Sequence, residues 1–230
     1  MFSHWMKTLL CGILATMVLA VQAEGGIAFD KTRAVIQPGR NESSFIFKNE
    51  SNWGYLLKSS IEDADGTKAL GVLVTPVVTK ALPESSQRIR IVITDPTRFP
   101  TDRETMLWYV GTAIPAQVAK DAVMQINFVN RIKVFYRPSG LSGNYAQAVS
   151  SLKVGRTGTQ LSLQNDSPFV ISMSSYRING KLVDTSEVVQ PFSTLLSKKV
   201  TLPEGAVDVE WEALDENGAL VSAKGKISAH

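Results

Sequence analysis

The segment MQINFVNRIKVFY, residues 124–136, alternates apolar and polar side chains over most of its length. A period of two residues is typical of a β-strand that has one apolar face. Counted from Ala122 to Tyr136, such a strand would be about 50 Å long, which is more than a single domain of ordinary size needs. One interpretation is that the strand extends beyond its own sheet at its N-terminal end, while Ile132, Val134 and Tyr136 pack in the core of their own domain.

The rest of the chain also consists mainly of short β-rich runs that are separated by turn signals. Asn179-Gly180 lies between two such runs and is typical of a two-residue β-hairpin. No segment keeps a helical period over the length of an ordinary helix, and no internal repeat is recognisable. We therefore predict an all-β fold of two immunoglobulin-like β-sandwiches, with an N-terminal domain over residues 24–139, a linker over 140–150 and a C-terminal domain over 151–230.

Residues 1–23 have the features of an export signal that is removed from the mature protein. A cation at Lys7 precedes an apolar run, and the small residues Val21 and Ala23 match the minus-three and minus-one positions of a cleavage site. The apolar run is too short for a membrane-spanning helix, which needs about 20 residues. We expect cleavage after Ala23 and an exported mature chain that is not embedded in the membrane.

The residue types that remain after this cleavage exclude several kinds of chemistry. Cys11 and His4 are lost with the signal, so the mature chain has no thiol and its single histidine is His230 at the end. Disulfides, histidine or thiolate metal sites and hydrolysis with a histidine base are therefore excluded. Asp102 and Glu104 are interpreted as a solvated or salt-bridged pair rather than an acid–base pair. We expect neither an enzyme nor a cofactor, and the net charge of +3 gives no sign of a nucleic-acid-binding surface.

Four motifs in a fixed order resemble one known family. They are TRAVIQPG at 32–39, FPTDRETMLWYVGTAIP at 99–115, RIKVFYRP at 131–138 and the Asp-x-x-Gly-Ala pattern at 215–219. Together they resemble the periplasmic pilus-assembly chaperones, the PapD family, over nearly the whole mature chain. Val110 and Ser60 depart from the asparagine and tryptophan usual there. The short segment between Pro115 and Met124, with no mature cysteine, resembles the subclass that has a short loop before the last strand of the first domain.

This resemblance implies an L-shaped pair of immunoglobulin-like domains that hold fimbrial subunits in the periplasm. Each subunit of such a system is a sandwich that lacks its last strand, and the chaperone supplies one of its own strands in its place, which is donor-strand complementation. The resemblance assigns the donor side chains to Met124, Ile126 and Phe128. Their apolar row would fill the groove of the subunit, while the main chain pairs with its open edge.

The resemblance also implies two sites of charge. Arg33 and Lys133 are expected to line the cleft between the domains and to hold the terminal carboxylate of the subunit, which would fix the register of the donor strand. Arg90 and Glu104 are expected to form a salt bridge between the domains with Glu216, or with Asp215 beside it. Such a buried bridge would serve to fix geometry more than to stabilise the fold.

The partners implied are fimbrial subunits and an outer-membrane usher, and a homodimer that caps its own donor strand is left open. A second reading is that the chain is itself an exported immunoglobulin-like fimbrial subunit or adhesin. Such subunits usually have one domain, a pair of cysteines and a free N-terminal donor segment, whereas this chain has two predicted domains and no mature cysteine. A sandwich enzyme of the copper–zinc dismutase type needs several histidines, which the mature chain lacks.

Overall fold

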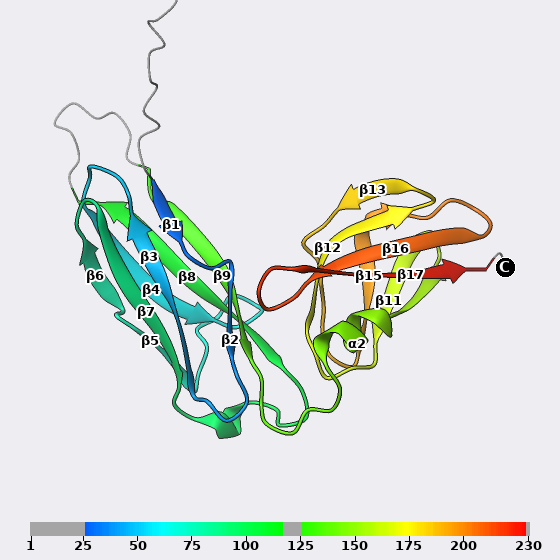
Figure 1. Ribbon diagram of the computed structural model, residues 1–230, viewed down its shortest axis with the longest axis horizontal. Helices are drawn as coiled ribbons and strands as arrows, with labels where there is room; N and C mark the ends of the chain where they lie inside the picture. The colour runs from blue at the N-terminus through cyan, green and yellow to red at the C-terminus, as the bar shows by residue number, and fades with distance from the viewer. Residues whose placement is uncertain (1–25, 117–125, 229–230) are drawn as a thin grey trace, which may run out of the picture.

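The computed structural model describes residues 26–116 and 126–228, which form two β-domains set at an angle to each other (Figure 1). The first domain contains β1 to β9, and the second contains the helix α2 and β10 to β17. The predicted export signal at 1–23 lies outside the described residues, as do Met124 and His230. The expectation of two β-sandwich domains in an L-shaped arrangement is confirmed.

The first domain is a sandwich of a four-stranded and a five-stranded sheet. The four-stranded sheet has the order β1-β3-β7-β5, and the five-stranded sheet has the order β2-β9-β8-β4-β6. The strands are β1 (Ile27–Phe29), β2 (Arg33–Ile36), β3 (Glu42–Asn49), β4 (Tyr55–Glu62), β5 (Val72–Thr75), β6 (Val78–Ala81), β7 (Ser85–Ile93), β8 (Thr105–Pro115) and β9 (Phe128–Tyr136). A short 3-10 helix, η1 (Pro96–Arg98), follows β7.

The N-terminal strand of this domain is divided between the two sheets. β1 pairs antiparallel with β3, whereas β2 pairs parallel with β9. Asp30 lies between them, and its carboxylate accepts a hydrogen bond of 2.7 Å from the amide of Ile46. The chain therefore crosses from one sheet to the other before Arg33, and this crossing places Arg33 beside the second half of β9.

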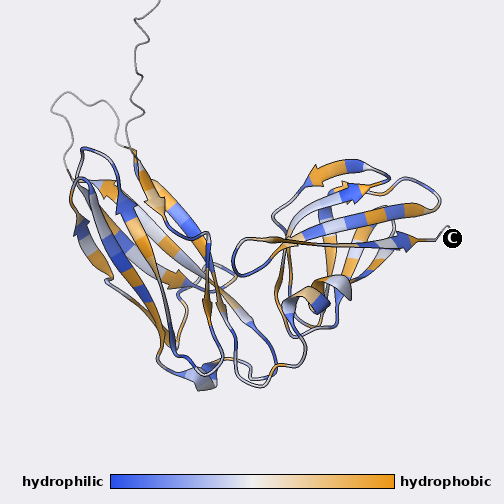
Figure 2. Cartoon of the chain, in the orientation of Figure 1, coloured by the Kyte–Doolittle hydropathy of each residue, from blue (hydrophilic) through white to orange (hydrophobic). Residues whose placement is uncertain are grey.

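The core of the first domain is built from alternate residues of facing strands (Figure 2). Leu107 and Tyr109 of β8 and Ile132 and Val134 of β9 point inward and are fully or almost fully buried. Tyr109 keeps a polar partner in the core, because its hydroxyl lies 3.0 Å from that of Ser59. The prediction that Ile132 and Val134 belong to the core of their own domain is confirmed.

The second domain is a smaller sandwich with its own core around the buried Trp211. Its strands are β10 (Lys153–Thr157), β11 (Gln160–Asn165), β12 (Ile171–Ile178), β13 (Lys181–Asp184), β14 (Val188–Val189), β15 (Ser193–Thr201), β16 (Val207–Leu214) and β17 (Leu220–Ile227). One sheet is β10-β11-β15, and the other is β13-β12-β16-β17 with β14 also paired to β12. The predicted hairpin at Asn179-Gly180 is confirmed, since both residues have positive φ and join β12 to β13.

The segment 140–150, predicted to be a linker, is for the most part a piece of the second domain. It contains α2 (Tyr145–Ser150), a six-residue helix that is capped by the side chain of Asn144. Ala148 and Val149 are buried in the second core, and Trp211 Nε1 donates to the carbonyl of Val149 over 3.0 Å. A helix of fewer than two turns is too short to show a hydrophobic period, so the sequence pattern did not indicate it.

An apolar cluster joins the two domains. Met106 and Phe135 on the outer face of the five-stranded sheet pack against Val170 of the second domain, and Val35, Trp108 and Val188 complete the cluster. This contact fixes the outer face of β2, β9 and β8 against the second domain. Within the described residues, no helix has the length and apolar character needed to cross a membrane.

Candidate functional site

The first half of β9 has an open backbone edge. On one side, the whole strand from Phe128 to Tyr136 pairs with β8. On its other side, β2 pairs only with Lys133 to Tyr136, so residues 128–132 have no strand neighbour there among the described residues. An open edge of this kind is a template for pairing with another chain.

Two of the three predicted donor residues, Ile126 and Phe128, are described, and they lie at the start of this open edge. The described part of the strand begins at Phe128, and Ile126 precedes it without regular structure. Ile126 is 58% exposed and Phe128 is 44% exposed, whereas Ile132, of the same parity, is buried. The ring of Phe128 lies against that of Tyr55 in its own domain, with the ring centroids 6.2 Å apart. The apolar row therefore continues past the core into solvent.

Four outward-facing side chains form a row across the five-stranded sheet. Arg33 on β2 is in register with Lys133 on β9, Lys133 with Trp108 on β8, and Trp108 with Glu62 on β4. Arg131, two residues before Lys133, bonds Glu62 over 3.2 Å, and its guanidinium lies 4.7 Å from the ring centroid of Trp108. The carboxylate of Glu62 thus pairs with Arg131, which leaves Arg33 and Lys133 as neighbouring cations.

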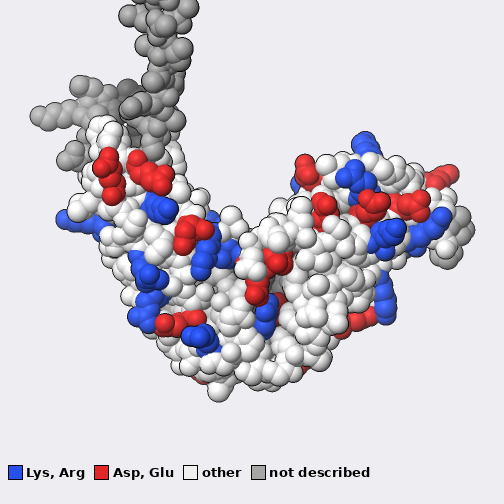
Figure 3. Space-filling model, in the orientation of Figure 1, with Lys and Arg blue, Asp and Glu red and all other residues white. Residues whose placement is uncertain are grey.

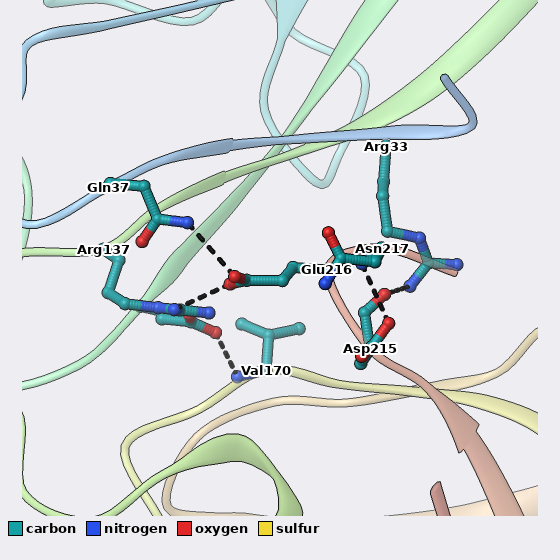
Figure 4. Close-up of polar contacts among 8 residues, drawn as sticks. Arg33, Gln37, Arg137, Val170, Asp215, Glu216 and Asn217 are labelled. Carbon is teal, nitrogen blue, oxygen red and sulfur yellow. Dashed lines mark hydrogen bonds and ion pairs between the residues drawn. The ribbon is translucent and has the colours of Figure 1, made fainter. Parts of the chain in front are cut away.

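Arg33 is held rigidly and is almost buried, with 8% of its surface exposed. Its Nη1 atom donates to the main-chain carbonyls of Leu214 and Asp215 in the second domain, each over 2.8 Å. Figure 4 shows the bond to Asp215. Its Nε atom is buried without a hydrogen-bond partner. Burial lowers the pKa of Arg33, although nearby Tyr145 and Asp215 oppose this shift. The guanidinium therefore has donor capacity that the chain itself does not use.

Lys133 is the second cation of the pair and is also poorly satisfied. Its ammonium group has one weak hydrogen bond, 3.4 Å long, to Ser172 Oγ of the second domain, and it lies 6.0 Å from the ring centroid of Trp108. Burial, together with the positive charge of Arg33, lowers the pKa of Lys133 to about 8. A carboxylate placed between the two side chains would relieve their repulsion and take up their free donors.

The structure brings Arg33 and Lys133 together, as the resemblance implies, and adds three residues that sequence reasoning did not assign. Trp108 and Arg131 flank Lys133 on the sheet, and Ser172 approaches it from the second domain. The odd positions along 131–135 indicated that Arg131 shares a face with Lys133. Nothing in the sequence indicated Ser172. The visible face of the molecule is hollowed between the domains, and charges of both signs are interspersed over it (Figure 3).

The salt bridge between the domains has a different cation from the one predicted. Arg137 Nε donates to Glu104 over 2.6 Å, and Arg137 Nη1 donates to Glu216 over 2.9 Å (Figure 4). Glu104 also accepts from the amide of Val170 over 2.8 Å. Arg90 instead pairs with Glu42 at the surface of the first domain, so its expected pairing with Glu104 is wrong.

The position of each arginine explains this correction. Arg90 lies on β7, in the sheet that faces away from the second domain, and its side chain is half exposed. Arg137 directly follows β9 at the parity of Lys133, so it continues the row that faces the second domain. Glu104 is 3% exposed, and burial raises its pKa while the charge of Arg137 opposes the rise. The alternation along 131–137 was the signal that could have identified Arg137.

The comparisons with known proteins agree with this architecture. Residues 26–142 match the family described as pili and flagellar-assembly chaperone, PapD N-terminal domain, and residues 147–225 match the pili assembly chaperone PapD, C-terminal domain. The chain therefore belongs to the PapD family of pili-assembly chaperones. A family described by assembly chaperones also fits the expectation of a non-catalytic protein.

Individual relatives lead to the same class. The chain is 32% identical to a probable fimbrial chaperone, LpfB of Escherichia coli, over 91% of this chain and 88% of that protein. The crystal structure of the Escherichia coli chaperone DraB is similar, with a TM-score of 0.75, 26% identity, and coverage of 87% of this chain and 98% of that one. The SafB chaperone of Salmonella enterica, solved in complex with the SafA pilin, has a TM-score of 0.79 at 24% identity, over 87% of this chain and 96% of that one. The chain is a fimbrial chaperone, and the alternative of a fimbrial subunit is not supported.

Proposed function

We propose that this chaperone captures fimbrial subunits in the periplasm through the open edge of β9 and hands them to an outer-membrane usher. The observation that carries the proposal is the arrangement along this one strand. Among the described residues, its first half has an unpaired backbone edge and an exposed apolar row, and its second half begins at the cation pair of Arg33 and Lys133. An open edge and an anchor for one end are what strand addition requires, and this single strand supports both roles.

In this proposal the side chains of Met124, Ile126 and Phe128 fill the groove of the subunit. The backbone of 128–132 then gives the subunit the hydrogen bonds that its missing strand would have made. Without a subunit, two copies of the chaperone can pair through the same edges as a homodimer that caps its own donor strand. Sedimentation of the free chain measures that second equilibrium.

The cation pair anchors the terminal carboxylate of the subunit. Among the described residues Arg33 donates only through Nη1 and Lys133 makes one weak hydrogen bond, so both cations keep donors for a carboxylate where the open edge ends and β2 begins. Charge-assisted bonds from two fixed cations to one carboxylate would set the register of the added strand. A subunit displaced by one residue would present the wrong face to the donor row.

The donor row is tested with Ile126→Asp and Phe128→Asp, in the mature protein co-expressed in the periplasm with fimbrial subunits. Because both side chains are largely exposed, the variants should keep the circular dichroism and melting temperature of the wild type. Capture should be lost, since a carboxylate cannot be desolvated in an apolar groove. Val129→Asp, at an exposed position of the opposite parity, is the matched control. An unfolded Phe128→Asp chain would show that the side chain is core, and normal capture by either folded variant would end the donor assignment.

The anchor is tested with Lys133→Ala against the subunit captured most strongly by the wild-type chain. Truncating one partner of a desolvated charge pair costs about 2 to 5 kcal/mol. That loss should disappear when the subunit carries an amidated or extended C-terminus, because no carboxylate then reaches the cleft. Lys199→Ala, which removes an exposed cation of the second domain, should bind as the wild type does. A double-mutant cycle in which the two losses simply add would rule out the anchor.

A further inference from the structure

The second domain has, at the end that meets the first domain, a corner made of two hydrogen-bonded turns. We define this second-domain corner as residues 165–170 and 190–193. The buried side chain of Asn165 accepts from Ser167 Oγ over 2.6 Å and donates to the carbonyls of Phe169, over 2.8 Å, and Gln190, over 3.0 Å. The second turn has Phe192 at a positive φ of 52°.

The first domain has a copy of this corner at residues 49–54 and 82–85, the first-domain corner. The side chain of Asn49 accepts from Ser51 Oγ over 2.7 Å and donates to the carbonyls of Trp53, over 2.6 Å, and Leu82, over 2.8 Å. Glu84 has the same φ of 52° as its counterpart in the second domain. The two corners therefore match in side-chain bonds, spacing and backbone conformation, although no repeat is recognisable in the sequence.

The second-domain corner contacts a charged dipeptide of the first domain, Arg103-Glu104. The amide of Glu104 donates to the carbonyl of Pro168 over 2.9 Å, and the amide of Val170 donates to the carboxylate of Glu104 over 2.8 Å. The guanidinium of the neighbouring Arg103 lies 4.8 Å from the ring centroid of Phe192. The main chain of this corner therefore forms hydrogen bonds with the acidic Glu104, and its Phe192 ring forms a cation–π contact with the basic Arg103.

The equivalent groups of the first-domain corner are in place, with Asn52 exposed and Gly54 half-buried. Gly54 corresponds to Val170 and Asn52 to Pro168, and neither the Gly54 amide nor the Asn52 carbonyl has a hydrogen-bond partner among the described residues. Trp53 corresponds to a buried phenylalanine of the second-domain corner, yet it is 56% exposed. The first-domain corner thus has the same binding groups, and no residue in the described part of the chain binds to them.

The residues that differ between the two corners should make the first-domain corner bind cations more strongly than the second-domain corner does. In the second-domain corner, the ring of Phe169 lies 5.4 Å from the guanidinium of Arg137. Trp53 occupies that place in the first domain, and indole is the better cation–π acceptor. Glu84 occupies the place of Phe192 and offers a carboxylate in place of a ring. It forms no ion pair within the described part of the chain.

The first-domain corner lies close to Phe128 at the start of β9, although β8 separates it from the open edge itself. Tyr55, which follows the corner directly, is the residue that Phe128 touches at 6.2 Å between ring centroids. The amide of Ala116, just after β8, donates to the carbonyl of Gly54 over 2.8 Å. Because Phe128 lies against Tyr55, a subunit domain whose groove encloses Phe128 would lie next to this corner.

We propose that the first-domain corner is a second contact site for the captured fimbrial subunit, and that it takes a surface segment in which basic side chains flank an acidic one. The inference rests on the proposed function, because the occupant is the subunit held by β9. The carboxylate of that segment binds the amide of Gly54, as Glu104 binds that of Val170. Its cations lie against Trp53 and Glu84.

The experiment compares the subunit affinities of Trp53→Ala and Glu84→Lys with those of two controls. Trp53→Ala should raise the Kd about two- to five-fold, the loss expected for an exposed cation–π contact. Glu84→Lys should raise it about ten-fold at low salt and less at 0.5 M salt, because ionic screening weakens repulsion between exposed charges. Leu73→Ala also removes an exposed apolar side chain, and Glu204→Lys makes the same charge reversal, both far from the corner, so both should leave the Kd unchanged.

Amide hydrogen exchange at Gly54 gives a readout that is independent of affinity. The Gly54 amide should become protected in the complex and stay unprotected in the complex of the Trp53→Ala, Glu84→Lys double variant. Suppose that the wild-type chain captures the subunit and that capture requires the free carboxylate of the subunit. If both corner variants then bind the subunit as tightly as the wild type does, the corner inference alone is overturned. Failure of the wild-type chain to capture any subunit would overturn the proposed function along with it. Corner variants that bind subunit normally but fail to bind an usher would assign the corner to that partner instead.

Discussion

Replacing Arg137 tests which cation joins the two domains. In the wild type, Arg137 bonds the buried Glu104 over 2.6 Å and the partly exposed Glu216 over 2.9 Å. Arg137→Ala would leave the Glu104 carboxylate, whose side chain is only 2% exposed, without a countercharge. Removing one partner of a buried pair costs about 3 to 5 kcal/mol, and we expect the lower end because the Arg137 side chain keeps 16% of its surface in water.

Arg90→Ala is the matched control, because it removes the arginine that the sequence resemblance had assigned to the bridge. Its pair with Glu42 is half exposed on both sides, so the loss should be at most about 1 kcal/mol. Urea unfolding of both variants, followed by tryptophan fluorescence, measures the difference. Small-angle X-ray scattering of the folded variants reports whether the angle between the domains is kept. Equal losses from the two variants would refute the assignment of Arg137.

The pH dependence of the Arg137→Ala variant gives an independent check. Burial already raises the pKa of Glu104 in the wild type, and loss of the arginine removes the main opposing interaction. The folded variant would then bind a proton at a pH where the unfolded chain does not, so its stability should increase as the pH falls from 7 towards 5. The second substitution Glu104→Gln should recover part of the loss, because it removes the buried charge. A deficit that stays constant with pH would mean that packing, not charge, is the cause.

Two further predictions concern Lys133 and the paired corners. Because the pKa of Lys133 is lowered to about 8, the folded chain loses this proton at a lower pH than the unfolded chain does. Between pH 8 and 10.5 the free chaperone should therefore become more stable, while its affinity for the subunit falls. Lys133→Arg should keep that affinity, as titration calorimetry at several pH values can show. Asn165→Ala and Asn49→Ala should each destabilise their domain by about 2 to 4 kcal/mol, because several main-chain carbonyls lose the side chain that donates to them. A loss of less than about 1 kcal/mol in urea unfolding would contradict this.

Features encoded by local periodicity could be predicted from the sequence. The alternation along 131–136 correctly predicted that Ile132 and Val134 lie in the core and that Lys133 lies on the outer face. Neighbouring side chains of a strand must point to opposite sides. The Asn-Gly hairpin was predicted for a similar local reason, since both of its residues adopt positive φ at low cost.

Features that depend on distant parts of the chain could not be predicted in this way. The partner of Glu104 is decided by which sheet faces the second domain. The alternation along 131–137 puts Arg137 on the same face as Lys133, but which face packs against the second domain depends on distant parts of the chain. The matching corners were missed because their shared residues are few. They are an Asn-x-Ser turn and a Pro-x-Ser turn, which lie far apart in sequence and are joined in the fold by the side chains of Asn49 and Asn165.

If Arg33 and Lys133 hold the terminal carboxylate of the subunit, as we propose, their position also determines the direction of the strand that pairs with β9. β2 runs parallel to β9 and pairs with it only from Lys133 onward, starting at Arg33, so the open edge and β2 lie in line on the same side of β9. A subunit strand whose terminal carboxylate is held at this junction must occupy the open edge with its C-terminus nearest Lys133. It therefore runs in the same direction as β9 and ends where β2 begins. Five residues of such a strand, at about 3.3 Å each, reach back from the anchor to Phe128, so the anchor and the donor row fix one register between them.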